Sequence, residues 1–327
     1  GMGLPPAPGA QGLQAVVPTG LTTPDPVQLQ RAFRDFQRQG VLACAVEASS
    51  IGLQEHRLSG THVRTALFTN FTQDHLDYHG SMAAYWQAKA ALFDWPGLQA
   101  AVVNVDDRQG AALALQLADR EHLDLWTCSR RGHARLQVRA HMTTEGMHLT
   151  WTEGSESVEC DLPLVGDYNA DNLLGVIAGL RALGHSLQDA VRACAQLSPV
   201  PGRLQRVDGK TNDPLVLVDY AHTPDAIAQV LASLRPLAER RQGRLWCLLG
   251  CGGDRDAGKR PRMAAAAEAA DEVILTSDNP RNESPEAIVA QMMQGLARPE
   301  LVRVELDRAR AIALAITLAA SRDVVVL

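Results

Sequence analysis

The sequence predicts an α/β fold in two domains, and three observations lead to this prediction. Short apolar runs typical of buried strands alternate with helical patterns along most of the 327 residues, which favours mostly parallel sheets. Residues 135–164 instead show the period-two pattern of an antiparallel hairpin group, with turns at TTEGM and TEGSE. The stretch SPVPGR at 198–203 then separates two series of elements. We therefore predict domains at 1–200 and 201–327, the second of them doubly wound.

In the first half, a helix is predicted over 25–39, with Asp25 as its N-cap and Pro26 at its first position. Apolar runs predict buried strands at 41–47, 63–70 and 100–107. Further helices are predicted at 80–93, 169–184 and 186–197. Polar loops follow the first two strands, and the ligand site of a parallel sheet lies at the carboxyl ends of its strands.

In the second half the same alternation begins again. The predicted strands are 215–219, 244–249, 272–277, 302–306 and 323–327. Helical patterns fall between them, at 224–236, 261–270, 284–296 and 308–320. Strand and helix in regular succession predict a parallel sheet with a helix layer on each face.

Composition excludes several classes of function. A net charge of -6 argues against a general nucleic-acid binder, and 4% aromatic residues are too few for base-stacking surfaces. The sequence has no apolar run of membrane-spanning length and no signal-peptide pattern. Its six cysteines are scattered, and only Cys247 and Cys251 are close together. We expect buried free thiols in a reducing cytoplasm, with no membrane or nucleic-acid partner.

The predicted helix at 80–93 carries a cation on its apolar face. Tyr85, Trp86 and Phe93 are among the apolar residues that recur at i, i+3 and i+4, and Lys89 lies on the same side. One interpretation is snorkelling, in which the stem packs and the ammonium group reaches water. The other is a functional lysine, because burial disfavours the ammonium form and leaves a nucleophilic amine.

The glycine-rich stretch GCGGDRDAGKR at 250–260 follows a predicted strand. It fails as a dinucleotide fingerprint, because Arg255 stands where a glycine or alanine belongs. It also fails as a phosphate-binding P-loop, because Arg260 replaces the hydroxyl residue that would ligate magnesium. Its basic residues still suit a carboxylate or a phosphate. The alternative is a solvated basic loop.

Several motifs in one order resemble those of the Mur ligases: EASS, DHLDYHG, AK, GDYNADN, PGR, DYAHTPDA, GCGGDRDAGKR and DNPR. The resemblance runs from about residue 20 to the last residue and implies a central ATPase domain followed by a Rossmann-like domain. The family's G-T-N-G-K-T loop and its G-K-G-H-E segment are not in the sequence, so we expect a fragment of a longer protein, inactive alone.

Among Mur ligases, the resemblance is to those that join diaminopimelate to a muramoyl peptide. It implies an ATP-dependent amide ligase of peptidoglycan synthesis, adding meso-2,6-diaminopimelate to UDP-N-acetylmuramoyl-L-alanyl-D-glutamate through an acyl phosphate. It also implies Mg²⁺, and carbon dioxide for a lysine carbamate. Three alternatives stay open: a lysine-adding ligase, a folylpolyglutamate-synthase-like ligase and a non-catalytic binding fragment.

The resemblance assigns roles residue by residue. Lys89 would be the carbamylated catalytic lysine, with Glu47 and His75 as the other magnesium-linked residues. The remaining residues divide by ligand, and Glu55 and Ile51 depart from the common pattern of glutamine and histidine. The muramoyl peptide would contact Thr22, Thr23, Ser49, Glu55 and Arg57; ATP would contact Asn169, Asn172, Arg203, Asp219 and His222; diaminopimelate would contact Arg255, Asp278, Asn279, Pro280 and Arg281.

Overall fold

The computed structural model describes residues 2–4, 14–17, 19–72, 75–143, 146–164, 166–197, 202–207, 209–210, 212–254 and 256–327. The chain divides into two compact units, each described here by itself. Unit 1 comprises Gly1–Arg139, Leu149–Cys160 and Ala170–Ser198; unit 2 comprises Ala140–His148, Asp161–Asn169 and Pro199–Leu327. The predicted boundary between residues 200 and 201 stays a prediction.

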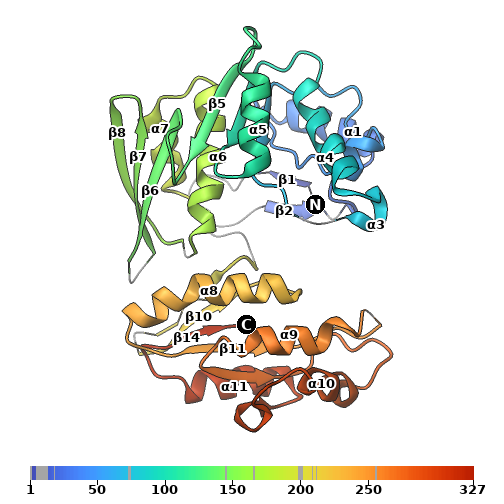
Figure 1. The fold of residues 1–327 in the computed structure, drawn as a ribbon, viewed down its shortest axis with the longest axis vertical. Helices are drawn as coiled ribbons and strands as arrows, with labels where there is room; N and C mark the ends of the chain where they lie inside the picture. The colour runs from blue at the N-terminus through green and yellow to red at the C-terminus, as the bar shows by residue number, and fades with distance from the viewer. Residues whose placement is uncertain are drawn as a thin grey trace. The chain divides into compact units, whose positions relative to one another are not determined.

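One six-stranded sheet, most of whose residues belong to unit 1, has the strand order β3-β4-β5-β6-β7-β8. Figure 1 labels its strands β5 to β8. Its first four strands are parallel: β3 (Thr65–Phe68), β4 (Ala100–Asn104), β5 (Asp124–Ser129) and β6 (Leu136–Met142). The next strands are β7 (Met147–Glu153) and β8 (Glu156–Leu162), at the predicted hairpin group. A separate antiparallel pair joins β1 (Met2–Leu4) and β2 (Gln14–Val17).

Helices cover both faces of the β3–β5 part of this sheet. Ala66 and Phe68 pack into a core with residues of α5 (Arg108–Leu117) and of the 3₁₀ turn η1 (Ala91–Asp94). Leu67 points the other way, toward Gly175 and Gly179 of α6 (Tyr168–Ala182). This alternation follows from the period-two geometry of a strand. The other helices of unit 1 are α1 (Pro26–Arg38), α2 (Ser50–Gln54), α3 (Leu76–His79), α4 (Met82–Ala90) and α7 (Leu187–Cys194).

The sheet of unit 2 has the order β13-β12-β11-β14-β10-β9. All its neighbouring strands are parallel except β9 (Gln205–Val207), which runs antiparallel to β10 (Leu215–Val218). The central strands are β11 (Leu245–Leu249) and β14 (Val324–Val326), and β12 (Glu272–Leu275) and β13 (Arg303–Val304) complete the sheet. β14 thus lies between two strands that precede it by about 80 and 110 residues.

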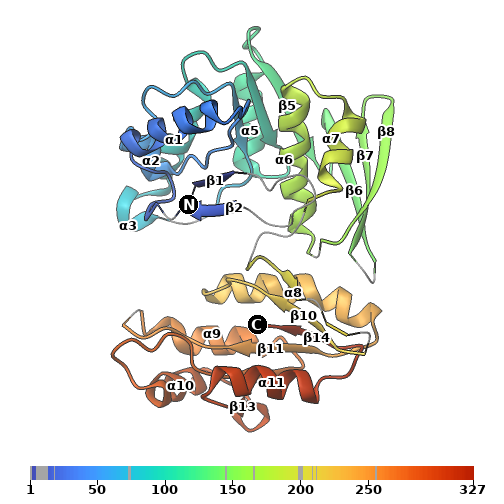
Figure 2. The same cartoon turned by 180° about the vertical axis from the view of Figure 1, so that it is seen from behind.

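Side chains of β11 alternate between two cores. Leu245, Cys247 and Leu249 pack with α8 (Pro224–Arg240), α9 (Lys259–Ala267) and α10 (Pro285–Met293). Trp246 and Leu248 pack with α11 (Arg308–Leu318). Figures 1 and 2 show α8 on one side of the sheet and α11 on the other. A 3₁₀ turn, η2 (Pro299–Leu301), precedes β13. The predicted α/β class, with a doubly wound second sheet, is confirmed.

One predicted strand is wrong. Residues 41–49 form no strand, residues 42–45 are exposed, and Leu42 is fully exposed. An apolar run becomes a buried strand only where a neighbouring strand supplies its ladder, and none of the described strands pairs with this segment. Glu47 is therefore an exposed residue outside any helix or strand, not the last residue of a buried strand.

The structure bears on two further expectations, one about the cysteines and one about membrane-spanning helices. Cys247 and Cys251 are buried, as expected, and burial raises the pKa of the Cys247 thiol to about 12. Cys44, to which that expectation did not extend, is exposed. None of the helices described is long and apolar enough to span a membrane.

Candidate functional site

Thr23 and residues 47–52 of unit 1 are joined by hydrogen bonds at the start of α2. The buried Thr23 hydroxyl donates to the Glu47 carbonyl at 2.7 Å and accepts from the Ser49 backbone N–H at 2.9 Å. The Ser49 hydroxyl caps α2 by accepting from Gly52 N–H at 3.0 Å. A Cβ on Gly52 would lie 2.7 Å from the Thr23 Cβ, so a glycine is required there. The predicted peptide-binding residues Thr23 and Ser49 are thus brought together.

Arg57 connects this cluster to α3. It donates to the Thr23 carbonyl at 3.2 Å and through Nε to Glu55 at 2.9 Å. Glu55 also accepts from the Tyr78 hydroxyl at 3.2 Å. The hydrogen bond from Arg57 lowers the pKa of Glu55, which therefore stays an anion. Thr22 is exposed beside this cluster.

An aromatic cluster surrounds Tyr85 on α4. The buried Tyr85 ring stacks on His79 at 5.3 Å between centroids, and Phe71 and His75 lie at 4.9 and 6.0 Å. The Lys89 Nζ lies 5.3 Å from the centroid of the same ring. The predicted stripe of 80–93 is therefore confirmed at Tyr85 and Phe93, both buried, although the α-helix ends at Ala90. Lys89 itself is half-buried.

The predicted magnesium-linked residues do not form a complete metal site among the described residues. Among the described residues, no three His, Cys, Asp or Glu side chains gather in the arrangement of a metal site. Glu47 and His75 are both exposed. His75 has a positive φ of 51°, a conformation that is uncommon outside glycine and asparagine. Magnesium usually retains several water ligands and needs only one or two carboxylates from a protein, so a partial donor set is compatible with it.

Three of the predicted ATP-binding residues lie together in unit 2. Asp219 accepts backbone N–H groups from Leu204 and Ala221, each at 2.9 Å. The Arg203 guanidinium lies 5.8 Å from the ring of the exposed Tyr220, and His222 meets that ring edge-on at 5.2 Å. An aromatic ring and a cation at one surface suit a nucleotide. The other two lie on α6, where Asn169 is half-buried and Asn172 is exposed.

Two loops at the carboxyl ends of β11 and β12 are bonded to each other. We call residues 250–258 the glycine loop and residues 276–284 the DNPR loop. Gly253 N–H donates to the Asn279 carbonyl at 2.9 Å, and the Arg281 Nη1 donates to the Gly253 carbonyl. Asp278 and Asn279 are exposed, and Pro280 is half-buried. Arg255 lies outside the described residues. Four predicted amino-acid-binding residues are therefore on one loop, beside the glycine loop.

Sequence reasoning missed the function of Arg260. It is 1% exposed, and it donates to both carboxylate oxygens of Glu283 at 2.7–2.8 Å. Arg260 is therefore a buried residue with a partly exposed ion-pair partner, and it is not part of a solvated basic loop. The two residues are 23 positions apart, so no local spacing signals the pair.

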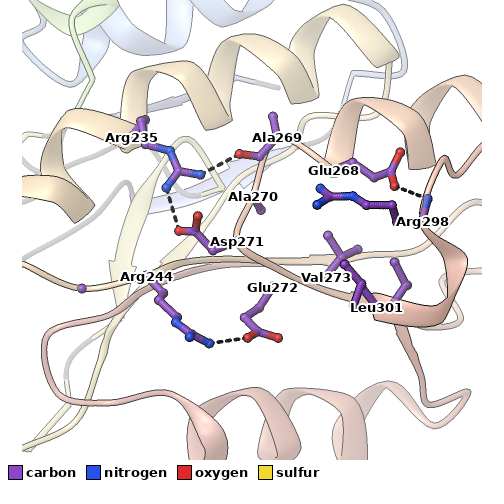
Figure 3. Close-up of a pocket in the computed structure, with 12 residues that line it drawn as sticks. Arg235, Arg244, Glu268, Ala269, Ala270, Asp271, Glu272, Val273, Arg298 and Leu301 are labelled. Carbon is purple, nitrogen blue, oxygen red and sulfur yellow. Dashed lines mark hydrogen bonds and ion pairs between the residues drawn. The ribbon is translucent and has the colours of Figure 1, made fainter.

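A hollow of about 650 Å³ lies at the opposite ends of the same strands (Figure 3). Four of its charged side chains form two ion pairs: Arg235 with Asp271 at 2.6 Å, and Arg244 with Glu272 at 2.6 Å. Ligands of open α/β sheets bind at the carboxyl ends of the strands, whereas this hollow lies at the amino ends. We therefore place the candidate site at the glycine and DNPR loops.

Comparisons with known proteins agree along the whole chain. Residues 8–180 match the Mur ligase middle domain, and residues 202–327 match the Mur ligase glutamate ligase domain. A UDP-N-acetylmuramoyl-L-alanyl-D-glutamate--2,6-diaminopimelate ligase of Acidovorax sp. (strain JS42) is 59% identical, over 100% of this chain and 64% of the relative. The protein of the same name from Janthinobacterium sp. (strain Marseille) is 48% identical, over 94% of this chain and 62% of the relative.

Solved structures give the same picture. A structure of a UDP-N-acetylmuramoyl-L-alanyl-D-glutamate--2,6-diaminopimelate ligase aligns with a TM-score of 0.73 and 36% identity, over 96% of this chain and 64% of that one. A Mycobacterium tuberculosis folylpolyglutamate synthase complexed with ADP aligns at 0.58 with 24% identity, over 81% of this chain and 60% of that one, which shows a shared fold. The chain thus spans a little under two thirds of the length of the curated relatives described above.

Proposed function

The chain belongs to the Mur ligase family, and on that premise we propose that it acts within an ATP-dependent amide ligase that adds meso-2,6-diaminopimelate to UDP-N-acetylmuramoyl-L-alanyl-D-glutamate. The observation that carries this proposal is the Arg281 side chain on the DNPR loop, held beside the glycine loop by its bond to Gly253. The names of the relatives support the choice of both substrates. The acceptor peptide, the amino acid and ATP would be its partners.

Arg281 would recognise the distal carboxylate of diaminopimelate. A guanidinium presents five N–H donors in a planar fork that matches a carboxylate. Asp278 and Asn279 are exposed on the same loop and would orient the amino group of the same substrate. Lysine lacks the distal carboxylate, so it would leave the donors of Arg281 that do not bind Gly253 without a carboxylate partner. The site would therefore discriminate between the two amino acids.

In unit 1, the Thr23–Ser49–Arg57 cluster would hold the muramoyl peptide. The Thr23 hydroxyl is already engaged with backbone groups, so its own function is to fix the loop. Arg57, 15% exposed and paired with Glu55, would keep its remaining donors for the peptide's carboxylate or the nucleotide's phosphates. The departure from glutamine at Glu55 is accommodated by this ion pair.

Lys89 would carry a carbamate, with Glu47 and His75 as the other residues facing magnesium. The ammonium group first loses a proton to solvent; the neutral Nζ then adds to the carbon of carbon dioxide and loses a second proton, so that a cation becomes an anion. Contact with the Tyr85 ring and partial burial of Lys89 place the amine at the edge of an apolar cluster. Magnesium, when bound, would neutralise charge that accumulates on phosphate and carboxylate oxygens. Asn172, Arg203, Asp219 and His222 would contact ATP.

Replacing Arg281 tests the assignment in the natural full-length protein. Arg281→Ala should raise the apparent barrier with meso-diaminopimelate by about 2–4 kcal/mol, the range for truncating one partner of a charge pair. The measurement is kcat/KM from incorporation of radiolabelled amino acid. Arg310→Ala, at an exposed arginine of α11, is the matched control and should retain full activity. Unchanged kcat/KM in Arg281→Ala would refute the assignment.

A further inference from the structure

The buried Arg260 connects four segments of unit 2. It lies in the first turn of α9 and donates through Nη1 to Glu283 at 2.8 Å and to Gln291 of α10 at 2.7 Å. Through Nη2 it donates to Glu283 at 2.7 Å and to the Gly252 carbonyl at 3.2 Å. One guanidinium therefore joins α9 and α10 to the glycine loop and the DNPR loop.

Glu283 also binds the backbone of the glycine loop. Its Oε1 accepts from the Asp254 N–H at 2.5 Å, so the same carboxylate binds Arg260 and the glycine loop. Asp254 in turn accepts from the Asn282 side chain at 2.7 Å. Arg281 donates to the Gly253 carbonyl, next to the carbonyl that Arg260 contacts. The position of the Arg281 guanidinium relative to the glycine loop therefore depends on the Arg260–Glu283 ion pair.

The chemistry of this pair favours positioning over stability. A bidentate arginine–carboxylate pair fixes both distance and orientation. Compared with well-packed apolar side chains, such a pair adds little net stability, because the desolvation of Arg260 offsets much of the attraction, although neutralising one partner alone is destabilising. Among the described residues, the buried Nε of Arg260 has no hydrogen-bond partner, which adds a further cost. The hydrogen bond from Arg260 lowers the pKa of Glu283 to about 2, so the carboxylate is charged at neutral pH.

We propose that Arg260 and Glu283 are positioning residues that set the separation between the Arg281 guanidinium and the glycine loop, and thereby the preference for an amino acid with a distal carboxylate. This inference rests on the proposed function. Neither side chain needs to touch the substrate. Both act through the backbone of the two loops that would bind it.

The test is Arg260→Lys in the natural full-length protein, because lysine keeps the charge and loses the planar fork. We expect the KM for meso-diaminopimelate to rise about tenfold, since small misplacements of binding groups are costly. The KM values for ATP and for the UDP-linked substrate, and kcat, should stay unchanged. The preference for diaminopimelate over lysine should fall. Glu283→Gln, which keeps the shape of the side chain, should shift the same constants in the same direction.

The matched control is Arg235→Lys. Arg235 forms an ion pair of similar length with Asp271 in the same unit, at the opposite ends of the strands (Figure 3). It should leave every kinetic constant unchanged, even where the thermal midpoint falls.

Two outcomes would overturn the inference while the proposed function stands. One is an unchanged KM for diaminopimelate in both site variants. The other is a lower thermal midpoint with equal changes in all three KM values, which would indicate a purely structural pair. If Arg260→Lys does not fold, the result for the partly exposed Glu283 decides. If the unmodified protein incorporates no diaminopimelate, the proposed function fails and this inference fails with it.

Discussion

Gly253→Ala should damage amino-acid binding through the backbone alone. A Cβ at this position would lie 1.8 Å from the carbonyl oxygen of Pro280 and 2.6 Å from its carbonyl carbon. Both atoms belong to the DNPR loop, so no side-chain rotation can relieve the clash. To reach a separation of 3.0 Å, one loop must retreat by about 1.2 Å, because packed interiors do not absorb such overlap.

A displacement of this size moves Arg281 away from the glycine loop. Misplacing a binding group by about 1 Å can cost about a hundredfold in rate. We therefore expect kcat/KM for meso-diaminopimelate to fall about a hundredfold, which corresponds to about 2.7 kcal/mol. The kcat/KM values for ATP and for the UDP-linked substrate should change much less.

The assay is steady-state incorporation of radiolabelled diaminopimelate by the natural full-length protein, with thermal unfolding measured in parallel. Gly258→Ala is the matched control in the same loop. Its φ of -65° suits alanine, and its nearest neighbour is a side-chain oxygen of Asp256 at 3.2 Å. We expect activity within about twofold of the unmodified protein for this control. Wild-type kcat/KM in Gly253→Ala would refute the link between loop packing and amino-acid recognition.

Three further predictions concern other parts of the molecule. Lys89→Ala should lose nearly all activity while the fold persists, because alanine suits a helix, and short carboxylic acids added to the assay should restore part of it; full activity would contradict the carbamate proposal. Thr23→Val should lower the free energy of unfolding by about 1–3 kcal/mol in denaturant titrations, because it strands the backbone partners of the hydroxyl, whereas Thr22→Val should have little effect. Because folding lowers the pKa of Glu283 from 4.5 to about 2, its stabilisation is complete above pH 4.5 and is lost as the pH falls toward 2. In denaturant titrations over that pH window, the free energy of unfolding should fall more steeply with falling pH in the unmodified protein than in Glu283→Gln. Equal slopes of this free energy against pH would contradict the assignment.

Local signals predicted much of the fold. Asp25 and Pro26 fixed the start of α1, where the Asp25 carboxylate accepts from two backbone N–H groups. The apolar runs of unit 2 became β10, β11, β12 and β14, because each is buried on both faces and needs no alternation. The hairpin group was predicted from its turn sequences, which are also local signals.

Sequence patterns failed as predictors where the structure depends on contacts between residues far apart in the chain. The apolar run at 41–47 gives no information about whether a neighbouring strand exists, and this one lacks a partner among the described strands. The helix α5 was not predicted. Its apolar residues include the exposed Leu115, so they do not fall on one face at helical spacing. At the site, the DNPR motif located Arg281, whereas the pair of Arg260 and Glu283 depends on a contact between two loops that no spacing encodes.

The central place of β14 has a consequence for synthesis on the ribosome. Its three valines, at most 5% exposed, supply the only ladder that joins β11 to β10 in the described sheet. Until residue 326 has left the ribosomal tunnel, β13-β12-β11 and β10-β9 are two half-sheets with open inner edges. Closing contacts over about 110 residues is slow, and open edges invite pairing with other chains. A nascent chain that stalls shortly before β14 should therefore depend on chaperones far more than one that stalls shortly after it.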